Sequence, residues 1–316
     1  MATSSSYNHA ITATQIITDA LFKCGAAAEG EDIPAEQTTL ALRTLNNLIK
    51  NLPVGGRNLW RRDEVYLFLN KSQPRYLLGP ETTDAEWCNV EDFVSTQLNG
   101  AVAASGTDLT VDSTTDMAAA DRLGLELTDG TRIWMAITSV DDSTGLTVPA
   151  ISGAASDNAT VYTYTTRPQR PMRILHARRK DGASGQDIPV DIESQELYRD
   201  QPLKTTNGTP VFVTYKPTLT SGRLEVWQPP NSIKMFLGLT MERPFEDFDA
   251  GANNPDLPQE WYLPLVWLLA DELEQDYRVL DQLRLQRLTQ KAAAAKAWVE
   301  NFDNDTGSIY FEPDYI

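Results

Sequence analysis

The sequence lacks the commonest combinations of catalytic residues. Its 316 residues include two histidines, His9 and His176, which lie far apart and near neither cysteine. Zinc sites and nucleophilic triads need such residues held close together. The sequence contains no GxxxxGK[ST], GxGxxG after a strand, GxSxG or HExxH motif. We therefore expect a protein that is not an enzyme and that holds no cofactor and no metal.

Carboxylates are the remaining candidates for chemistry. The densest group is Glu242, Glu246, Asp247 and Asp249, and two such groups could act as general acid and base. A solvated acidic loop explains them more simply, because catalytic carboxylates need a specific arrangement in space. The sequence DNDTG at 303–307 is similar to a calcium loop, but its glycine comes one position early and no glutamate closes it. We interpret this segment as the end of a helix.

Two basic groups could contact phosphate or a neighbouring subunit. The first is Arg61 with Arg62, and the second is Arg178, Arg179 and Lys180 in the sequence RILHARRKDG. A charged hairpin end is the other explanation for the second group. The formal charge of -17, from 27 basic and 44 acidic residues, argues against tight binding of nucleic acid, which depends on neutralising phosphates.

From cysteine usage and hydropathy we expect a soluble protein that is not exported by a secretory signal. Cys24 and Cys88 show no CxxC spacing, which is typical of free thiols in a reducing environment. The first residues lack both the basic start and the apolar core of a secretory signal. No apolar stretch reaches the roughly 20 residues that a membrane span requires.

Helices are predicted near both ends of the chain, over residues 14–24, 35–52, 259–277 and 281–302. The third is apolar on almost every side, which indicates a helix enclosed by protein. The fourth has an apolar stripe, and its other face carries Arg284, Arg287, Lys291 and Lys296. Because each apolar face needs a covering surface, we expect the helices from the two chain ends to pack together as a bundle.

Between these helices the pattern alternates, which predicts short antiparallel strands. Residues 98–166 contain about five of them, and the Asp129-Gly130 turn would set Leu125 opposite Trp134. We interpret this stretch as an inserted, barrel-like β module. A second antiparallel section covers residues 171–241. The expected fold is therefore α+β, with a discontinuous domain (1–97 and 167–316), the module at 98–166 and an extended tail at 303–316.

The end of the last helix and the tail carry apolar side chains that follow no regular period after Phe302. They are Trp298, Phe302, Ile309, Tyr310, Phe311 and Tyr315. Apolar residues on a chain end need a partner surface, so we assign them to contacts with another chain. The alternative is a tail that folds back on its own β section.

The order of these elements resembles the head-to-tail adaptor proteins of short-tailed bacteriophages, of the tail tubular protein A and DNA-stabilisation type. The N-terminal match is ITATQIITDALFKCGAAAEGEDIPAEQTTLALRTLNNLIKNL followed by GRNLWRRDE, and the C-terminal match is LPQEWYLPLVWLLADELEQDY with the Ala-rich helix and acidic tail. These blocks cover about a third of the chain. The middle differs from the smallest members, which have less between the helices.

The resemblance implies a structural virion protein that forms a ring of roughly twelve copies beneath the portal. Such a ring extends the DNA channel, helps to retain the packaged genome and receives the tail nozzle. The implied partners are further copies, the portal protein, a nozzle protein of the tail tubular protein B type and tail fibres. Double-stranded DNA would pass through without sequence-specific binding. The protein would be made in the host cytoplasm and act at the head–tail junction, with the terminal apolar residues contacting the portal or a neighbouring subunit.

Two alternatives from other classes stay open. One is a virion-associated carboxylate hydrolase of cell-wall polysaccharide, with the β module as its carbohydrate binder. The other is a structural protein that anchors fibres, which differs from an adaptor if its ring symmetry does not match that of the portal.

Overall fold

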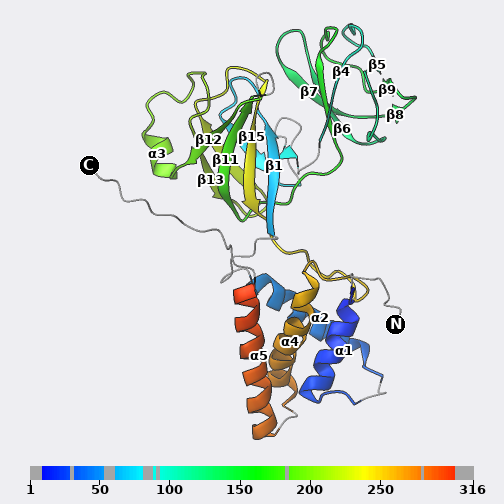
Figure 1. Cartoon of the computed structure of the whole chain (residues 1–316), viewed down its shortest axis with the longest axis vertical. Helices are drawn as coiled ribbons and strands as arrows, with labels where there is room; N and C mark the ends of the chain where they lie inside the picture. Colours follow the sequence, from blue (N-terminus) through cyan, green and yellow to red (C-terminus); the bar gives the residue numbers. More distant parts are fainter. Residues whose placement is uncertain are drawn as a thin grey trace, which may run out of the picture. The chain divides into compact units, whose positions relative to one another are not determined.

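The computed structural model describes residues 9–28, 32–52, 61–80, 88–89, 93–181, 185–278 and 281–302, of which 88–89 and 299–302 are described by their backbone alone. The chain is α+β and divides into two compact units (Figure 1). The helical unit comprises Met1–Trp60 with Pro244–Ile316, and the β unit comprises Arg61–Arg243. The boundaries therefore fall at 60/61 and 243/244, whereas the sequence pattern led us to expect the helices and the second β section in one domain.

The helical unit consists of α1 (Ala13–Cys24), α2 (Ala35–Asn51), the 3-10 turn η3 (Gln259–Trp261), α4 (Tyr262–Tyr277) and α5 (Gln282–Phe302). Local signals set these bounds. Thr12 and Gln15 form a capping box, in which the Gln15 amide donates to Thr12 Oγ1 over 3.3 Å and the Thr12 amide donates to Gln15 Oε1 over 2.9 Å. Gly25 ends α1 at φ 77, a left-handed conformation that costs glycine little.

The core of the helical unit draws on helices from both ends of the chain. Leu21 of α1, Leu45 of α2 and Leu269 of α4 are fully buried in one hydrophobic cluster, to which α5 contributes Leu288. In the ribbon, α4 packs against both α1 and α5 (Figure 1). This packing removes the apolar face of each helix from water, which is the main stabilising contribution that these helices make.

The connection from the β unit back to α4 is also anchored on this core. Phe245 and Phe248 are buried in the cluster. Asn46 of α2 holds the backbone of Phe248 through two hydrogen bonds, from its Nδ2 to the carbonyl (3.0 Å) and from the amide to its Oδ1 (2.9 Å). Lys50 donates to the Phe245 carbonyl over 2.6 Å.

The main sheet of the β unit has eight strands in the order β2-β14-β13-β12-β11-β15-β1-β3. Their bounds are β1 (Arg62–Phe68), β2 (Arg75–Leu78), β3 (Cys88–Asn89), β11 (Arg173–Asp181), β12 (Asp187–Ile192), β13 (Phe212–Pro217), β14 (Gly222–Trp227) and β15 (Met235–Glu242). Along β15 buried and partly exposed residues alternate, as expected for a strand with one face on a core. The central strand β15 pairs with β1 and β11.

One strand pair departs from the antiparallel pattern that the sequence predicts. Strands β12 and β13 run parallel, because the connection between them crosses over through the helix α3 (Gln195–Asp200). Our expectation of a wholly antiparallel section was wrong at this point, and α3 was missed. Its signal is Ser194, whose side chain accepts from the Leu197 amide as an N-cap.

The β module closes through two smaller sheets, with strand orders β4-β10-β6-β7 and β5-β9-β8. Their bounds are β4 (Val94–Gln97), β5 (Asp108–Thr110), β6 (Arg122–Glu126), β7 (Arg132–Ala136), β8 (Ser139–Val140), β9 (Gly145–Thr147) and β10 (Thr160–Tyr164). The inner faces of both sheets contribute to one apolar cluster that includes Leu109, Leu125 and Val161.

The β6–β7 hairpin turns at Asp129-Gly130 as expected, but its register differs by one residue. Gly124 lies opposite Trp134, not Leu125. The reason is a three-residue loop: the Leu127 amide bonds to the Thr131 carbonyl (2.8 Å), so that Thr128 joins the turn, and Gly130 adopts φ 74. At Gly124 a Cβ would come 2.7 Å from the Trp134 ring, so any larger residue here would have to displace that ring.

An aromatic cluster joins the β module to the main sheet. Phe68 of β1 is buried, and its ring centroid lies 4.9 Å from Tyr162 of β10 and 5.3 Å from Trp134 of β7. Arg132 lies over the rings of Phe68 and Tyr162, at 5.3 and 5.1 Å from their centroids, and its Nη2 donates to the Ile233 carbonyl over 2.6 Å. These contacts explain why the module and the sheet form one unit.

Candidate functional site

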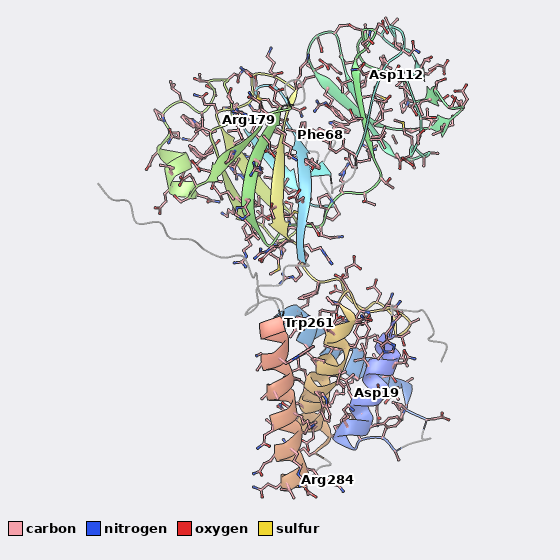
Figure 2. All side chains as sticks on the ribbon, viewed as in Figure 1. Asp19, Phe68, Asp112, Arg179, Trp261 and Arg284 are labelled. Carbon is pink, nitrogen blue, oxygen red and sulfur yellow. The ribbon has the colours of Figure 1, made fainter. Side chains whose placement is uncertain are left out.

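A shallow hollow on the helical unit combines apolar and basic side chains. This basic hollow has a cavity volume of about 260 Å³. It is lined by Phe22, Lys23 and Gly25 at the end of α1, by Trp267 of α4, and by Arg284, Arg287, Leu288 and Lys291 of α5. Figure 2 labels Arg284 near the start of α5.

Helix geometry brings these residues together. On α5 the four lining residues have the spacing i, i+3, i+4 and i+7, which places them on one face. Leu288 points into the core and is 4% exposed, whereas Arg284, Arg287 and Lys291 are exposed. The basic face of α5 could be seen in the sequence. The contributions of α1 and α4 were missed, because they depend on how the helices pack.

The chemistry of the basic hollow follows from its floor and its rim. The half-buried Trp267 ring lies under Lys23 and Lys291, whose amines are 4.5 and 5.6 Å from its centroid. Phe22 is 38% exposed beside them. The hollow therefore offers an apolar surface to a side chain and several ammonium or guanidinium donors to an acidic group.

The charges of the basic hollow are mostly unneutralised. Arg284 Nε lies 3.9 Å from Asp281 Oδ2. Across the part of the chain that the structure describes, Lys23, Arg287 and Lys291 make no ion pair with a carboxylate. In a chain with a net charge of -17, carboxylates were available to neutralise them. Unpaired cations around an apolar floor favour a site for an acidic partner.

A larger polar groove lies on the β unit, with a volume of about 890 Å³. Its lining is rich in hydroxyl and amide groups and includes Asp112, which Figure 2 labels, Glu126 and Asp157. Asp157 Oδ1 accepts from the Gly100 amide over 2.8 Å, which holds a loop at the rim. The groove is suited to a ligand that presents hydroxyl groups.

Arg132 is part of the floor of this groove. Burial lowers the pKa of its guanidinium, and its Nε and Nη1 atoms are enclosed without a hydrogen-bond acceptor in the described part of the chain. Its Nη2 atom is bonded to the Ile233 carbonyl. Arg132 therefore holds the module against the sheet by stacking on the aromatic rings, and it presents no accessible donor to a ligand.

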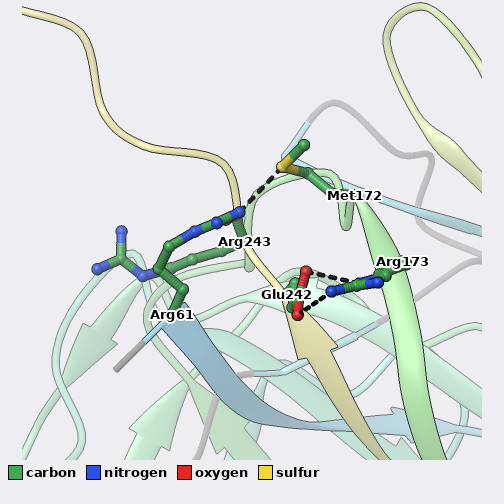
Figure 3. A network of polar contacts seen from close by, with 5 residues as sticks. All are labelled: Arg61, Met172, Arg173, Glu242 and Arg243. Carbon is green, nitrogen blue, oxygen red and sulfur yellow. Dashed lines mark hydrogen bonds and ion pairs between the residues drawn. The ribbon is translucent and has the colours of Figure 1, made fainter. Parts of the chain in front are cut away.

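Arg61 makes structural contacts within the β unit, and its contact with phosphate or another subunit stays a prediction. It is 1% exposed, and its Nε and Nη2 atoms donate to the Arg243 carbonyl over 3.2 and 3.1 Å. Figure 3 draws Arg61 beside Arg243, with a bond of 3.1 Å from the Arg61 Nη2 atom to the Met172 sulfur. The Arg243 amide donates back to the Arg61 carbonyl over 3.1 Å. These bonds tie the first residue of the β unit to its last. Nearby, Glu242 accepts two bonds of 2.7 Å from Arg173, so this carboxylate is paired.

The other predicted basic residues lie on the main sheet and contact neighbours within the β unit. Arg178 Nε is 2.8 Å from Asp187 Oδ1, and Lys180 Nζ donates to the Tyr66 hydroxyl over 3.2 Å. Arg179 Nη1 reaches the Pro210 carbonyl at 3.5 Å, and Arg62 is half-buried on β1. This arrangement favours the charged hairpin end over a phosphate site, since strands β11 and β12 pair antiparallel here. Their contact with phosphate or another subunit stays a prediction.

The terminal contact residues are mostly outside the described residues. Trp298 lies on α5 and is 49% exposed. The side chain of Phe302, together with Ile309, Tyr310, Phe311 and Tyr315, falls beyond what the structure describes. The four clustered carboxylates that the sequence suggested, Glu242, Glu246, Asp247 and Asp249, fall in both units, because the boundary follows Arg243. Asp247 forms an ion pair of 2.5 Å with Lys50.

Within the described ranges, no group of three or more His, Cys, Asp or Glu side chains could hold a metal ion. No helix of these ranges combines the length and the hydropathy that crossing a bilayer demands. Cys24 is buried, and this burial raises the pKa of its thiol, which makes it a poor nucleophile.

Comparison with known proteins adds little to this geometry. No protein-family model and no curated protein matches the chain. One similar solved structure is VP17, a capsid protein of bacteriophage P23-77, with 11% identity over 61% of this chain and 77% of that chain and a TM-score of 0.12. Another is the VP16-VP17 complex of the two major capsid proteins of the same phage, with 11% identity, coverages of 63% and 78%, and a TM-score of 0.13. At these TM-scores the matches carry no argument about fold or function.

Proposed function

We propose that this chain is a structural protein of a phage virion, a head-to-tail adaptor that forms a ring beneath the portal. The observation that supports the proposal is the core of the helical unit. Helices α1 and α2 share this core with α4 and α5, although the whole β unit separates them in the sequence. The adaptor resemblance implies the same pairing of the two chain ends.

The charge of the chain supports a role around a DNA channel. A net charge of -17 disfavours condensation onto phosphates, so DNA can pass without being held. In this role the protein is not an enzyme and needs no cofactor. It retains the genome by forming part of a closed channel, in place of direct binding to the DNA.

The partners follow from the surfaces that each unit presents. The helical unit carries the basic hollow and Trp298, and we assign it to contacts with the portal and with further copies. The β unit, with its module and polar groove, would receive the nozzle protein and tail fibres. The site of action is then the head–tail junction of the virion, after synthesis in the host cytoplasm.

Electron microscopy of the full chain, alone and mixed with the portal protein from the same virion, tests this function. We expect a ring on one end of the portal, with a symmetry that matches the portal. A chain that never associates with the portal would contradict the adaptor function. A ring whose symmetry differs from the portal would favour the fibre-anchoring alternative.

The polar groove favours one further candidate, a β unit that binds or cleaves cell-wall polysaccharide. Its lining supplies the hydroxyls and carboxylates that such a ligand needs, including Asp112 and Glu126. The test is release of reducing ends from cell-wall polymers by the wild type and by Asp112→Asn and Glu126→Gln. Activity that both substitutions abolish, while Asp116→Asn outside the groove retains it, would favour the hydrolase over the adaptor.

A further inference from the structure

We propose that the basic hollow of one copy binds the C-terminal segment, residues 303–316, of a second copy. This inference rests on the proposed ring, and it names the contact that joins neighbouring copies. It assigns the apolar residues of the tail, Ile309, Tyr310, Phe311 and Tyr315, to a neighbouring subunit and not to the portal.

The basic hollow has the size and the chemistry of a peptide site. Its volume of about 260 Å³ is below the roughly 300–1,000 Å³ of most small-molecule pockets. It therefore suits a few side chains of a longer segment that continues over the surface. The Trp267 ring and the exposed part of Phe22 form an apolar floor for an aromatic group. Lys23, Arg287 and Lys291, which have no acidic partner among the described residues, surround that floor.

The C-terminal segment has the complementary composition. Its sequence DNDTGSIYFEPDYI contains carboxylates and aromatic residues and no lysine or arginine. Glu312 follows directly after Tyr310 and Phe311, and Asp314 comes two residues later, so one short peptide presents rings and carboxylates together. Aromatic anchors with flanking charges are the usual determinants of such contacts. The four basic residues of the hollow match a segment in which every charged side chain is acidic.

The length of α5 favours a second copy over the same chain as the source of the segment. From Arg287 to Phe302 the helix rises by about 22 Å at 1.5 Å per residue. Residues 303–309 span at most about 23–25 Å when fully extended. The segment could place its own Tyr310 or Phe311 in the hollow only by running back along α5 close to full extension, and only Tyr315 would have ample chain to reach it. A neighbouring copy has no such restriction.

A complementation experiment with two variants tests this inference. The tail-less variant ends at Phe302 and keeps the hollow, and the hollow variant carries Arg287→Glu with Lys291→Glu and keeps the segment. We expect each variant alone to be monomeric by light scattering after size exclusion, and their mixture to form a one-to-one dimer. That dimer has one intact hollow and one intact segment. A mixture that stays monomeric, while the wild type associates, would contradict the proposal.

The strength of self-association is compared between the hollow variant and a control variant with a substitution elsewhere on α5. The hollow variant should associate about tenfold more weakly than the wild type, because it loses two cations and gains two repelling charges. Lys296→Glu makes the same charge change as Lys291→Glu alone, but on another face of α5 and outside the hollow, and should alter association by less than about twofold. Adding Glu312→Lys and Asp314→Lys to the hollow variant should restore association. Equal loss in the Lys296 and hollow variants would show a general charge effect and overturn the inference.

Binding of a synthetic peptide identifies the source of the segment. A labelled peptide of residues 303–316 should bind the tail-less variant, and a peptide with Tyr310→Ala and Phe311→Ala should not. Peptide binding without a mixed dimer would mean that the segment occupies the hollow of its own chain. No peptide binding would mean that the hollow takes a different acidic partner. Both results overturn the inference, and neither affects the adaptor function, which portal binding by the full chain tests separately.

Discussion

The basic residues at the candidate sites of the two units differ in how fully the fold pairs them with acceptors. In the β unit Arg61, Arg132 and Arg173 contact carbonyls, aromatic rings or a carboxylate of the same unit. In the helical unit Arg287 and Lys291 extend from α5 and find no acidic partner among the described residues. The difference teaches that residue type alone does not mark a binding site. The informative property is whether the fold already satisfies the charge.

The two units also differ in how their cores are built. Aliphatic side chains on helix stripes fill the helical unit, whereas a cluster of aromatic rings joins the module and the sheet of the β unit. We therefore expect core substitutions in one unit to leave the other unit folded, because each unit has its own core.

The largest effect is expected from Phe68→Ala in the β unit. The side chain is 1% exposed and contacts both Trp134 and Tyr162, so its loss leaves a cavity at the junction and should lower the free energy of unfolding by about 3–5 kcal/mol. Denaturation followed by near-ultraviolet circular dichroism measures it. The helical signal at 222 nm should keep its midpoint. Phe22→Ala, on the surface of the helical unit, is the control and should cost far less.

The corresponding substitution in the helical unit is Leu269→Ala. Leu269 is fully buried on α4, and its truncation should lower the free energy of unfolding of that unit by about 2–5 kcal/mol. Leu263, on the same helix, is 62% exposed, and Leu263→Ala should change the value by less than about 0.5 kcal/mol. If Leu269→Ala lowered the stability of the β unit as much as that of the helical unit, the two cores would not be independent.

A smaller effect is expected at the start of α1. Thr12→Ala removes the side-chain oxygen that accepts from the Gln15 amide and should cost about 1 kcal/mol in the helical unit. Thr39→Ala on α2 is the control, because its hydroxyl only bonds back to the Ala35 carbonyl within the helix. Thermal unfolding at 222 nm compares them. A larger loss for the Thr39 variant would argue against the capping box.

The smallest effect is expected at low pH in the β module. Hydrogen bonds from the Thr144 and Gly145 amides lower the pKa of Asp142 below its usual value near 4. A lowered folded-state pKa means that this carboxylate stabilises the folded state above the unfolded pKa and loses that contribution as the pH falls through the folded pKa. Asp142→Asn should flatten the pH dependence of unfolding of the β unit below about pH 4. Asp116→Asn, an exposed carboxylate elsewhere in the module, is the control.

Local signals in the sequence determined the helices and many turns of this protein. The bounds of α1, α2 and α5 lie within about two residues of the expected ones, because caps, proline and the helical period act over a few neighbouring residues. The Asp129-Gly130 turn was predicted for the same reason. The basic face of α5 was also visible in the sequence, and it supplies half of the lining of the basic hollow.

The tertiary structure decided what depends on residues far apart in the chain. The register of β6 and β7 depends on Thr128, whose amide bonds to the distant Ala154 carbonyl over 2.9 Å and so joins the turn. The parallel pairing of β12 with β13 joins two strands that the crossover through α3 separates. Arg61 is buried because Arg243, at the other end of the unit, offers its carbonyl. Lys23 and Trp267 complete the basic hollow only when α1, α4 and α5 pack together. Such contacts arise from the energy of the whole packed unit, and so no local pattern in the sequence encodes them.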